Sequence, residues 1–393
     1  MLDVAEALHR WVEQGRACAV ATVVAVDGSA PRPPGAALAV DDGGAAIGSV
    51  SGGCVEAAVY ELCRQALEDG RTVVERFGHS DEDAFAAGLT CGGSIEVLVT
   101  PVRGEVLPAA LAAAAAGEAA ALARVVDGPP ELLGAALLVR PDGSYEGGLG
   151  GGPALDRAAA DEARALLDAG RTGTVRLGED GGRCGRPLTL LVESSLPAPR
   201  LLVFGAVDVA SALARVGRFL GYEVTVCDAR PVFTTAARFP DAHDVVLAWP
   251  HRYLEAEADA GRLDARTVLC VLTHDPRFDV PLLERALRLP VAYVGAMGSR
   301  RTHADRERRL REAGVTEPEL ALLRSPIGLD LGARTPEETA LSIGAEIVAH
   351  RRGGSGLPLT GTRTPLHHEV SPEAPAAPPA RPAHDRCLKA AGT

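Results

Sequence analysis

An internal repeat in the first half of the chain is the feature that most constrains its fold. The segment GAALAV at 35–40 recurs as GAALLV at 134–139, and an Asp/Gly turn and a glycine-rich stretch follow each copy. A helical stretch then closes with Gly-Arg-Thr, at 70–72 in one copy and at 170–172 in the other. Self-similarity of this kind indicates one supersecondary unit present twice. The pattern predicts a unit made of strand, turn, strand, glycine loop, helix and strand.

The second half of the chain follows a different pattern. After a Pro-Ala-Pro linker at 197–199, apolar strand-like runs alternate with helical stretches, which is typical of a doubly wound parallel sheet. The expected strands are 201–204, 223–227, 244–247, 267–272 and 291–294, and the expected helices are 208–219, 301–313 and 336–350.

These patterns predict an α/β protein of three parts. Residues 1–198 hold the duplicated α/β unit, with copies at about 20–103 and 130–195. Residues 199–358 form a Rossmann-like doubly wound parallel sheet. Residues 359–393 are rich in Pro and Ala without periodicity, and we expect them to be a disordered tail.

Composition excludes several functional classes. A net charge of −12 and an aromatic share of 4% argue against a nucleic-acid partner. Lys389 is the only lysine, so no ordered lysine serves a Walker-A ATPase or a Schiff-base enzyme. The sequence shows no signal-peptide pattern, no membrane-span pattern and no Cys-x-x-Cys pair. We therefore expect a cytoplasmic protein that binds neither nucleic acid nor membrane.

The glycine-rich loop of the first copy, Gly48–Glu56, is the first candidate site. Backbone N–H groups that lead into a helix N-terminus form a cradle for anions. A thiol in the first helical turn has a lowered pKa, and its thiolate ligates soft metals or accepts sulfur. The second copy has Pro153 and Leu155 where the first has Cys54 and Glu56, which favours chemistry in the first copy. A tight turn with an inert thiol, and simple drift between the copies, stay open as alternatives.

Other residues could extend this site. Arg32 lies on a rigid Pro-rich loop, and Cys91 and Gly92 open a strand that could bring a second sulfur close to the first. Arg32 could equally lie on a solvated turn. Cys184 repeats the second cysteine in the other copy, which favours a structural role for Cys91. Four further cysteines sit in helix or strand patterns and are expected to be small core residues: Cys18, Cys63, Cys227 and Cys270.

The Rossmann-like half has a modified dinucleotide fingerprint. Gly205 begins the turn after the first strand, and Asp228 ends the next strand where a ribose-binding acid would lie. Val207 replaces the glycine that lets the backbone approach a pyrophosphate, and Asp208 would repel it. The sequence therefore argues against tight NAD(P) binding.

The ends of two later strands carry residues that suit an anion better than the turn at Gly205 does. His274 follows one strand, and Gly298-Ser299-Arg300-Arg301 combines a glycine turn, a helix start and two arginines at the same edge of the sheet. We expect a phosphate site there. The alternatives are that His274 pairs with Asp275 and that the arginines belong to a solvated helix face, since more follow them: Arg306, Arg308, Arg309 and Arg311.

The motifs at 48–56, 90–93 and 295–302 resemble those of the XdhC/CoxI family, the xanthine dehydrogenase accessory factors. The Gly-Ser-x-Pro-Arg loop that ends at Arg32 belongs to the same pattern, and the resemblance covers about residues 8–358. Further matches in the second half are Asp228–Pro231, Pro326–Asp330 and Thr335–Glu338.

The resemblance implies a chaperone for the molybdenum cofactor, molybdopterin, which it carries rather than uses. Such a protein holds the cofactor while a cysteine desulfurase supplies the terminal sulfido ligand. It then inserts the cofactor into a xanthine dehydrogenase or carbon monoxide dehydrogenase-type molybdoenzyme. The resemblance also implies that Cys54 is needed for cofactor binding. We expect a homodimer, because small-cofactor chaperones commonly dimerise.

From these observations we hypothesise that the cofactor lies in a cleft between the two domains, with molybdenum at Cys54 and phosphate at the Gly298 turn. Two rival functions stay open: an NAD(P)-dependent oxidoreductase, and a scaffold that bridges the desulfurase and the client enzyme. The predicted cofactor-binding residues are Arg32, Ser51, Gly52, Gly53, Cys54, Glu56, Cys91, Gly92, Gly205, His274, Gly298, Ser299, Arg300 and Arg301, with Cys54 also a possible molybdenum contact.

Overall fold

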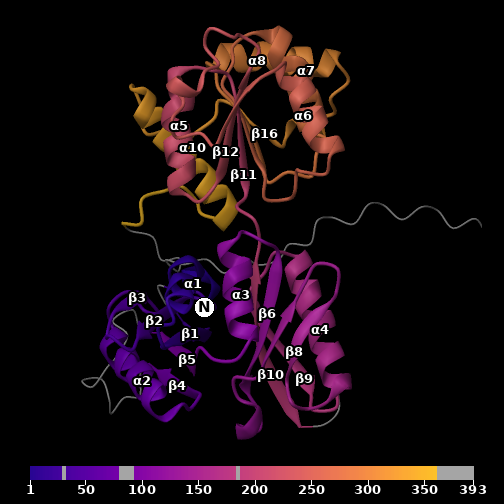
Figure 1. Cartoon of the computed structure of the whole chain (residues 1–393). Coiled ribbons are helices and arrows are strands. Elements are labelled where there is room, and N and C mark those ends of the chain that lie inside the picture. Colours follow the sequence, from indigo (N-terminus) through magenta and orange to yellow (C-terminus); the bar gives the residue numbers. More distant parts are fainter. Residues whose placement is uncertain (29–31, 79–92, 183–185, 361–393) are drawn as a thin grey trace, which may run out of the picture.

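The computed structural model describes residues 1–28, 32–78, 93–182 and 186–360. It contains two five-stranded sheets in the N-terminal part and one six-stranded sheet in the C-terminal part. Figure 1 shows the two N-terminal sheets side by side and the third sheet, with its helices, at one end of them. The predicted α/β class, with a duplicated unit followed by a Rossmann-like sheet, is confirmed.

The first unit is an antiparallel sheet with the strand order β3-β2-β1-β5-β4. A short 3₁₀ turn at Leu2–Val4 precedes it. Its elements are α1 (Ala5–Glu13), β1 (Cys18–Asp27), β2 (Ala37–Asp41), β3 (Ala46–Gly48), α2 (Glu56–Asp69), β4 (Val73–Phe77) and β5 (Ser94–Pro101).

The second unit has the matching order β8-β7-β6-β10-β9. It begins with α3 and β6, before the predicted start at about residue 130, and α1 precedes the first sheet in the same way. The repeat in the sequence does not reveal these two helices, whose buried faces are built from different residues: Ala5, Leu8 and Trp11 in α1, and Leu107, Ala110, Leu111 and Ala113 in α3. The elements are α3 (Val106–Ala115), β6 (Ala120–Asp127), β7 (Ala136–Val139), β8 (Tyr145–Gly148), α4 (Pro153–Asp168), β9 (Gly173–Gly178) and β10 (Pro187–Ser195).

The central strands of each N-terminal sheet are buried on both faces. In β1, Ala19, Ala21 and Val23 pack against α2, as the corresponding residues of β6 pack against α4. The alternate residues Cys18 and Val20 face the other unit, where α1 and α3 fill the space between the sheets. Because side chains alternate between the faces of a strand, such doubly covered strands are apolar throughout.

A buried ionic cluster joins the two units. The Glu193 carboxylate on β10 accepts hydrogen bonds from the Arg124 guanidinium on β6 at 2.7 Å and from the Leu2 N–H at 3.1 Å, and it pairs with the Met1 amino group. Arg124 also donates to the Thr22 hydroxyl on β1 at 2.8 Å. Burial alone would raise the pKa of Glu193, but the two cations hold it below its ordinary value. The cluster therefore depends on an ionised Glu193.

Replacing Glu193 by Gln should lower the free energy of unfolding by about 3–5 kcal/mol, because two buried cations lose their counter-charge. The control is Glu118→Gln, which removes a largely exposed ion pair with Arg140 and should cost less than about 1 kcal/mol. Urea denaturation of both variants measures the difference. Equal midpoints for the two variants would show that the cluster does not hold the units together.

The C-terminal sheet is parallel throughout, with the order β13-β12-β11-β14-β15-β16. Helices α5 and α10 cover one face, and α6, α7 and α8 cover the other. The elements are β11 (Arg200–Phe204), α5 (Asp208–Phe219), β12 (Glu223–Asp228), β13 (Asp244–Leu247), α6 (Pro250–Asp259), β14 (Val268–Val271), α7 (Pro276–Ala286), β15 (Tyr293–Ala296), α8 (Arg300–Glu312), α9 (Glu317–Leu320), β16 (Leu323–Arg324) and α10 (Pro336–Arg352).

Five elements of this domain differ from the sequence-based expectation. Helices α6, α7 and α9 and the two-residue strand β16 are not predicted by the sequence pattern. Helix α7 contains an internal proline, Pro281, which such a pattern reads as a break. Strand β15 lies two residues later than predicted and ends in Gly295-Ala296. Gly295 is a poor strand former by propensity, but a side chain there would collide with Ile327 and Tyr293.

The linker enters the C-terminal domain at the amino ends of its strands. The Pro197 carbonyl accepts from Arg266 at 2.9 Å, and the Pro199 carbonyl accepts from the N–H of Glu223 at 2.9 Å. The amino ends therefore face the N-terminal domain, and the carboxyl ends lie at the far end of the molecule, near the α8 label in Figure 1. Among the helices of the described ranges, none combines the length and apolar character of a membrane span.

Candidate functional site

The loop between β3 and α2 is held by one carboxylate. Glu56 accepts from the Ser49 hydroxyl at 2.7 Å, from the Ser51 N–H at 2.9 Å and from the Gly53 N–H at 2.7 Å, and also from the Ser51 hydroxyl. Burial raises the pKa of Glu56, but the hydroxyl and N–H donors outweigh it and lower the pKa to about 2. Glu56 is therefore ionised and committed to the loop.

The predicted anion cradle is consequently filled by the chain itself. The remaining N–H groups bond to serine hydroxyls: Gly52 to Ser49 at 2.9 Å, and Cys54 and Val55 to Ser51 at 3.0 Å each. The backbone N–H groups of 51–55 all have acceptors within the loop. An external anion would have to displace Glu56 to use them.

Cys54 lies just before α2, and not in its first turn as the sequence suggested. The helix begins at Glu56, with Val55 as its N-cap. Cys54 is half-buried and packs at the edge of the core of the first unit. The other described cysteines, Cys18, Cys63, Cys227 and Cys270, are buried as expected, and burial raises the pKa of each thiol, to about 11 for Cys18.

The structure corrects the pairing of the two copies at this loop. Asp156 in the first turn of α4 accepts from the Leu149 N–H at 2.8 Å, as Glu56 does from the N–H of Ser51. Leu155 is buried in its core like Val55. Glu56 therefore corresponds to Asp156, not to Leu155, and Cys54 corresponds to Ala154. The acid is a shared structural feature, and the cysteine is what distinguishes the first copy.

The other predicted residues near this loop have different placements. Arg32 donates to the Asp3 carboxylate at 2.9 Å, and Asp3 in turn accepts from the N–H of Ala37 at 3.2 Å. The Ala37 carbonyl accepts from Ser49, so Arg32 supports the entrance of the loop through Asp3. Cys91 and Gly92, like Cys184, lie outside the described residues.

At the carboxyl edge of the C-terminal sheet, Asp228 ends β12, and its carboxylate binds the fingerprint turn that follows β11. Its carboxylate accepts from the Ala206 N–H at 2.7 Å and from the Arg230 guanidinium at 2.7 and 3.0 Å. Burial raises the pKa of Asp228, but these donors outweigh it and lower the pKa. Gly205 has a φ of +119°, and a Cβ there would lie 3.0 Å from the Thr273 nitrogen. Gly205 is thus required for the close approach of β11 to the end of β14.

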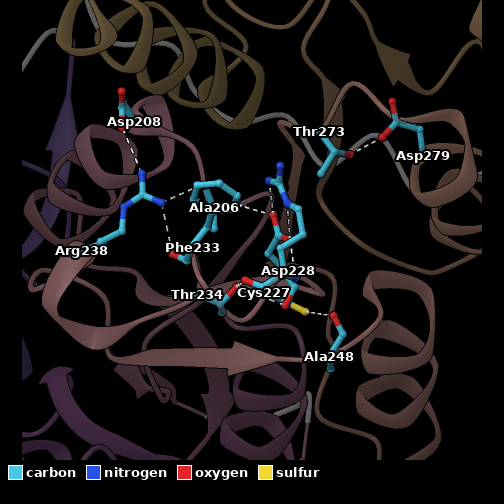
Figure 2. A network of polar contacts seen from close by, with 11 residues as sticks. Ala206, Asp208, Cys227, Asp228, Phe233, Thr234, Arg238, Ala248, Thr273 and Asp279 are labelled. Atoms are coloured by element: carbon cyan, nitrogen blue, oxygen red, sulfur yellow. Dashed lines mark hydrogen bonds and ion pairs between the residues drawn. The ribbon is translucent and has the colours of Figure 1, made fainter.

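A second arginine covers the start of α5. Figure 2 shows Arg238 between Asp208 and Phe233, where it donates to the Asp208 carboxylate at 3.2 Å and to the Phe233 carbonyl at 3.3 Å. Asp228, the acid that would bind a ribose, and Asp208, the first residue of α5, thus both pair with arginines of this chain.

The Gly298 turn is held from beneath by a buried arginine. Arg306, 3% exposed, donates to the Met297 carbonyl at 2.8 Å and to the Asp279 carboxylate at 3.0 Å. Asp279 also accepts from Thr273 at the end of β14, as Figure 2 shows. Arg306, which the sequence groups with the arginines of a solvated helix face, is therefore buried and does not belong to that face. Its spacing of four from the buried Leu310 is the signal that could have identified it.

The exposed residues of α8 separate into two groups. Ser299 caps the helix by accepting from the Thr302 N–H at 3.2 Å. Arg308, Arg309 and Arg311 pair with acidic neighbours on or near the helix. Arg300 and Arg301 are exposed at the helix start, and the structure records no ion pair for either within its described part.

His274 is exposed at the end of β14. Asp275 caps α7 and pairs with Arg277 at 2.6 Å, so the alternative that His274 pairs with Asp275 is not what the structure contains.

The two candidate regions do not meet within one chain. The Cys54 loop belongs to the N-terminal domain, which adjoins the amino ends of the C-terminal strands. Gly298, Arg300 and Arg301 lie at the carboxyl ends, on the opposite side (Figure 1). The hypothesis of one cleft lined by both regions is therefore wrong for a single chain. No cluster of three or more metal-ligating side chains occurs among the described residues.

The fold and the two regions define a class: a duplicated antiparallel α/β domain, carrying one cysteine loop, joined to a Rossmann-type domain. Residues 201–347 match the XdhC Rossmann domain, and residues 11–78 and 113–178 match the XdhC and CoxI family. The chain belongs to the XdhC and CoxI family.

Curated relatives agree with this assignment. A Bacillus subtilis protein described as a probable xanthine dehydrogenase subunit is 28% identical, over 88% of this chain and 96% of its own length. The molybdenum cofactor insertion chaperone PaoD of Escherichia coli is 27% identical over 88% of this chain and 87% of its own. The uncharacterised Escherichia coli protein YqeB is 30% identical, and the chain spans about half of it, 47%.

A solved structure shares the fold. A crystal structure described as a xanthine dehydrogenase from Bacillus halodurans superposes with a TM-score of 0.66 at 22% identity, over 91% of this chain and 98% of that one.

The loop around Cys54 should lose stability in acid. Because the folded pKa of Glu56 lies below its ordinary value of 4.5, its contribution is complete above about pH 4.5 and disappears as the pH falls toward 2. Glu56→Gln should therefore lower the Tm at pH 7, and the gap from wild type should narrow below about pH 4.5 and close only toward pH 2. Glu61→Gln, at an exposed position of the same helix, is the control. A gap that stays constant from pH 7 to pH 3 would contradict this assignment.

Proposed function

We propose that this protein binds the molybdenum cofactor, holds it for sulfuration and inserts it into a xanthine dehydrogenase or carbon monoxide dehydrogenase-type molybdoenzyme. Membership of the family and the role that PaoD is named for support a part in the maturation of this cofactor. The observation that carries the proposal is the Cys54 loop, in which a rigid hydrogen-bonded frame presents one thiol that the second copy lacks.

The donor set suits this cargo. Molybdopterin supplies two dithiolene sulfurs to molybdenum, so the protein needs to add no complete metal cage. A single half-buried thiol matches the preference of a soft metal for sulfur. We propose that Cys54 contacts the metal end, and that Ser49, Ser51 and Glu56 hold it in position.

The phosphate of the cofactor requires a separate anion site. We propose Arg300 and Arg301, because they begin α8 and lack acidic partners in the described structure, unlike the arginines behind them. Gly298, Ser299 and the buried Arg306 shape the turn that carries them.

Since these two regions lie apart in one chain, we propose a homodimer in which the Cys54 loop of one copy faces the carboxyl edge of the other. A cysteine desulfurase is the proposed sulfur donor, and the protein is proposed to act in the cytoplasm. We propose no NAD(P) chemistry, because Asp228 is already bound to Ala206 and Arg230, and Asp208 places a negative charge at the start of α5.

The first test compares two alanine substitutions. Each one gives the first unit the residue that the second unit has at the corresponding position. Cys54→Ala should remove most of the bound molybdenum, whereas Cys63→Ala, at the position of the buried Ala163, should retain it. Molybdenum and pterin are measured in protein purified from a host that makes the cofactor. Equal molybdenum in both variants, with matching circular dichroism spectra, would contradict the role of Cys54.

The second test separates a composite site from two independent ones. Arg300→Gln/Arg301→Gln should lose the cofactor, as should Cys54→Ala. Mixed dimers of the two variants contain one intact composite site and should recover about half of the wild-type content. A mixed dimer that stays empty would contradict the composite site.

A cofactor-free variant that still binds the desulfurase and the client would favour the scaffold role instead.

A further inference from the structure

A cavity of about 330 Å³ lies where the two N-terminal units meet. No residue of the Cys54 loop or of the carboxyl edge of the parallel sheet lines it. It sits at the start of α3 and the end of β5. Its polar lining is Thr72, Thr100, Arg103 and Glu105, and glycines of the second unit, Gly134 and Gly148, close it.

The duplication identifies the counterpart of this cavity. Thr100 lies opposite Val20 in the first sheet, as Glu193 lies opposite Leu122 in the second. The side chain of Thr72 approaches Gly134, as that of Thr172 approaches Gly35. The cavity is therefore the counterpart of the place where the Glu193 carboxylate forms the ionic cluster. Here the chain supplies threonine, and no carboxylate.

The cavity contains an unused buried hydroxyl. Thr100 is 5% exposed, and its Oγ1 has no hydrogen-bond partner among the described residues. Buried hydroxyls in folded proteins nearly always have a partner, from the protein or from a bound molecule. The Thr100 hydroxyl is therefore a donor that a ligand in the cavity can satisfy.

Two positive features border the same space. Helix α3 begins here without a side-chain cap, so the N–H groups of Val106 and Leu107 are available at its positive end. The guanidinium of Arg103 lies against Gly70, where any Cβ would collide with it, and the structure shows no ion pair for it in the ranges described. A glycine with a φ of +74° thus makes room for this arginine.

We propose that this cavity binds a small oxyanion, a phosphate or a carboxylate, through Arg103, the Thr100 hydroxyl and the start of α3. The ligand takes the place that the Glu193 carboxylate fills in the other unit. Glu105 also lines the cavity and opposes the ligand's charge. The site is therefore tuned to moderate affinity, and it is independent of the cofactor region.

Isothermal titration of the full chain with inorganic phosphate, and separately with succinate, at constant ionic strength tests the proposal. One of the two should bind with a stoichiometry of one per chain, and which of them does so identifies the class. Arg103→Gln should weaken binding by about 10-fold or more, as expected for one lost charge-assisted hydrogen bond. Thr100→Val, which keeps the shape of the side chain, should also weaken it.

Three further variants make the result specific. Glu105→Gln removes the opposing charge and should strengthen binding, whereas Arg10→Gln, an exposed arginine of α1, should leave it unchanged. Cys54→Ala should bind the anion as wild type does, which separates this site from the proposed cofactor function. Absence of binding by both anions, or equal weakening in the Arg10 and Arg103 variants, would overturn the proposal.

Discussion

The buried carboxylate of Glu193 is the constraint on which the N-terminal domain depends. Two units of the same topology pack through their inner faces, and at their junction Glu193 binds Arg124 and the Met1 amino group. This contact fixes the first residues of the chain, so that Val4 packs against Gly48 at the start of the cysteine loop. A buried charge is costly unless it is paired, so the cluster sets the geometry of the junction more than it adds stability.

Comparison of the two loops separates structure from specialisation. Both units place an acid in the first turn of the following helix and use it to bind a backbone N–H. The first unit adds Ser49 and Ser51, where the second has Gly148 and Gly150, and both serines bond to Glu56. The cysteine and the two serines are therefore the features that the first copy has acquired or kept, and together they make a stiff frame around one thiol.

The sequence predicted the duplicated unit and most strands of the parallel sheet, because hydrophobic periodicity reports burial directly. It missed the helices α6, α7 and α9 and the two-residue strand β16. It also missed the pairing of Glu56 with Asp156, which depends on hydrogen bonds and not on residue identity. It also missed the burial of Arg306. A buried arginine and a solvated one look alike until the acceptors around them, here Asp279 and the Met297 carbonyl, are known.

In both domains, a turn that commonly binds an external anion binds a carboxylate of the chain instead. A glycine loop before a helix and a fingerprint turn each offer backbone N–H groups to anions. Here Glu56 fills the first and Asp228 the second with the chain's own carboxylates. In the function proposed above, recognition is left to side chains on such turns, Cys54 and Arg300 among them. A site of this kind holds a ligand by a few contacts over a preformed frame, which suits a protein that must also release what it binds.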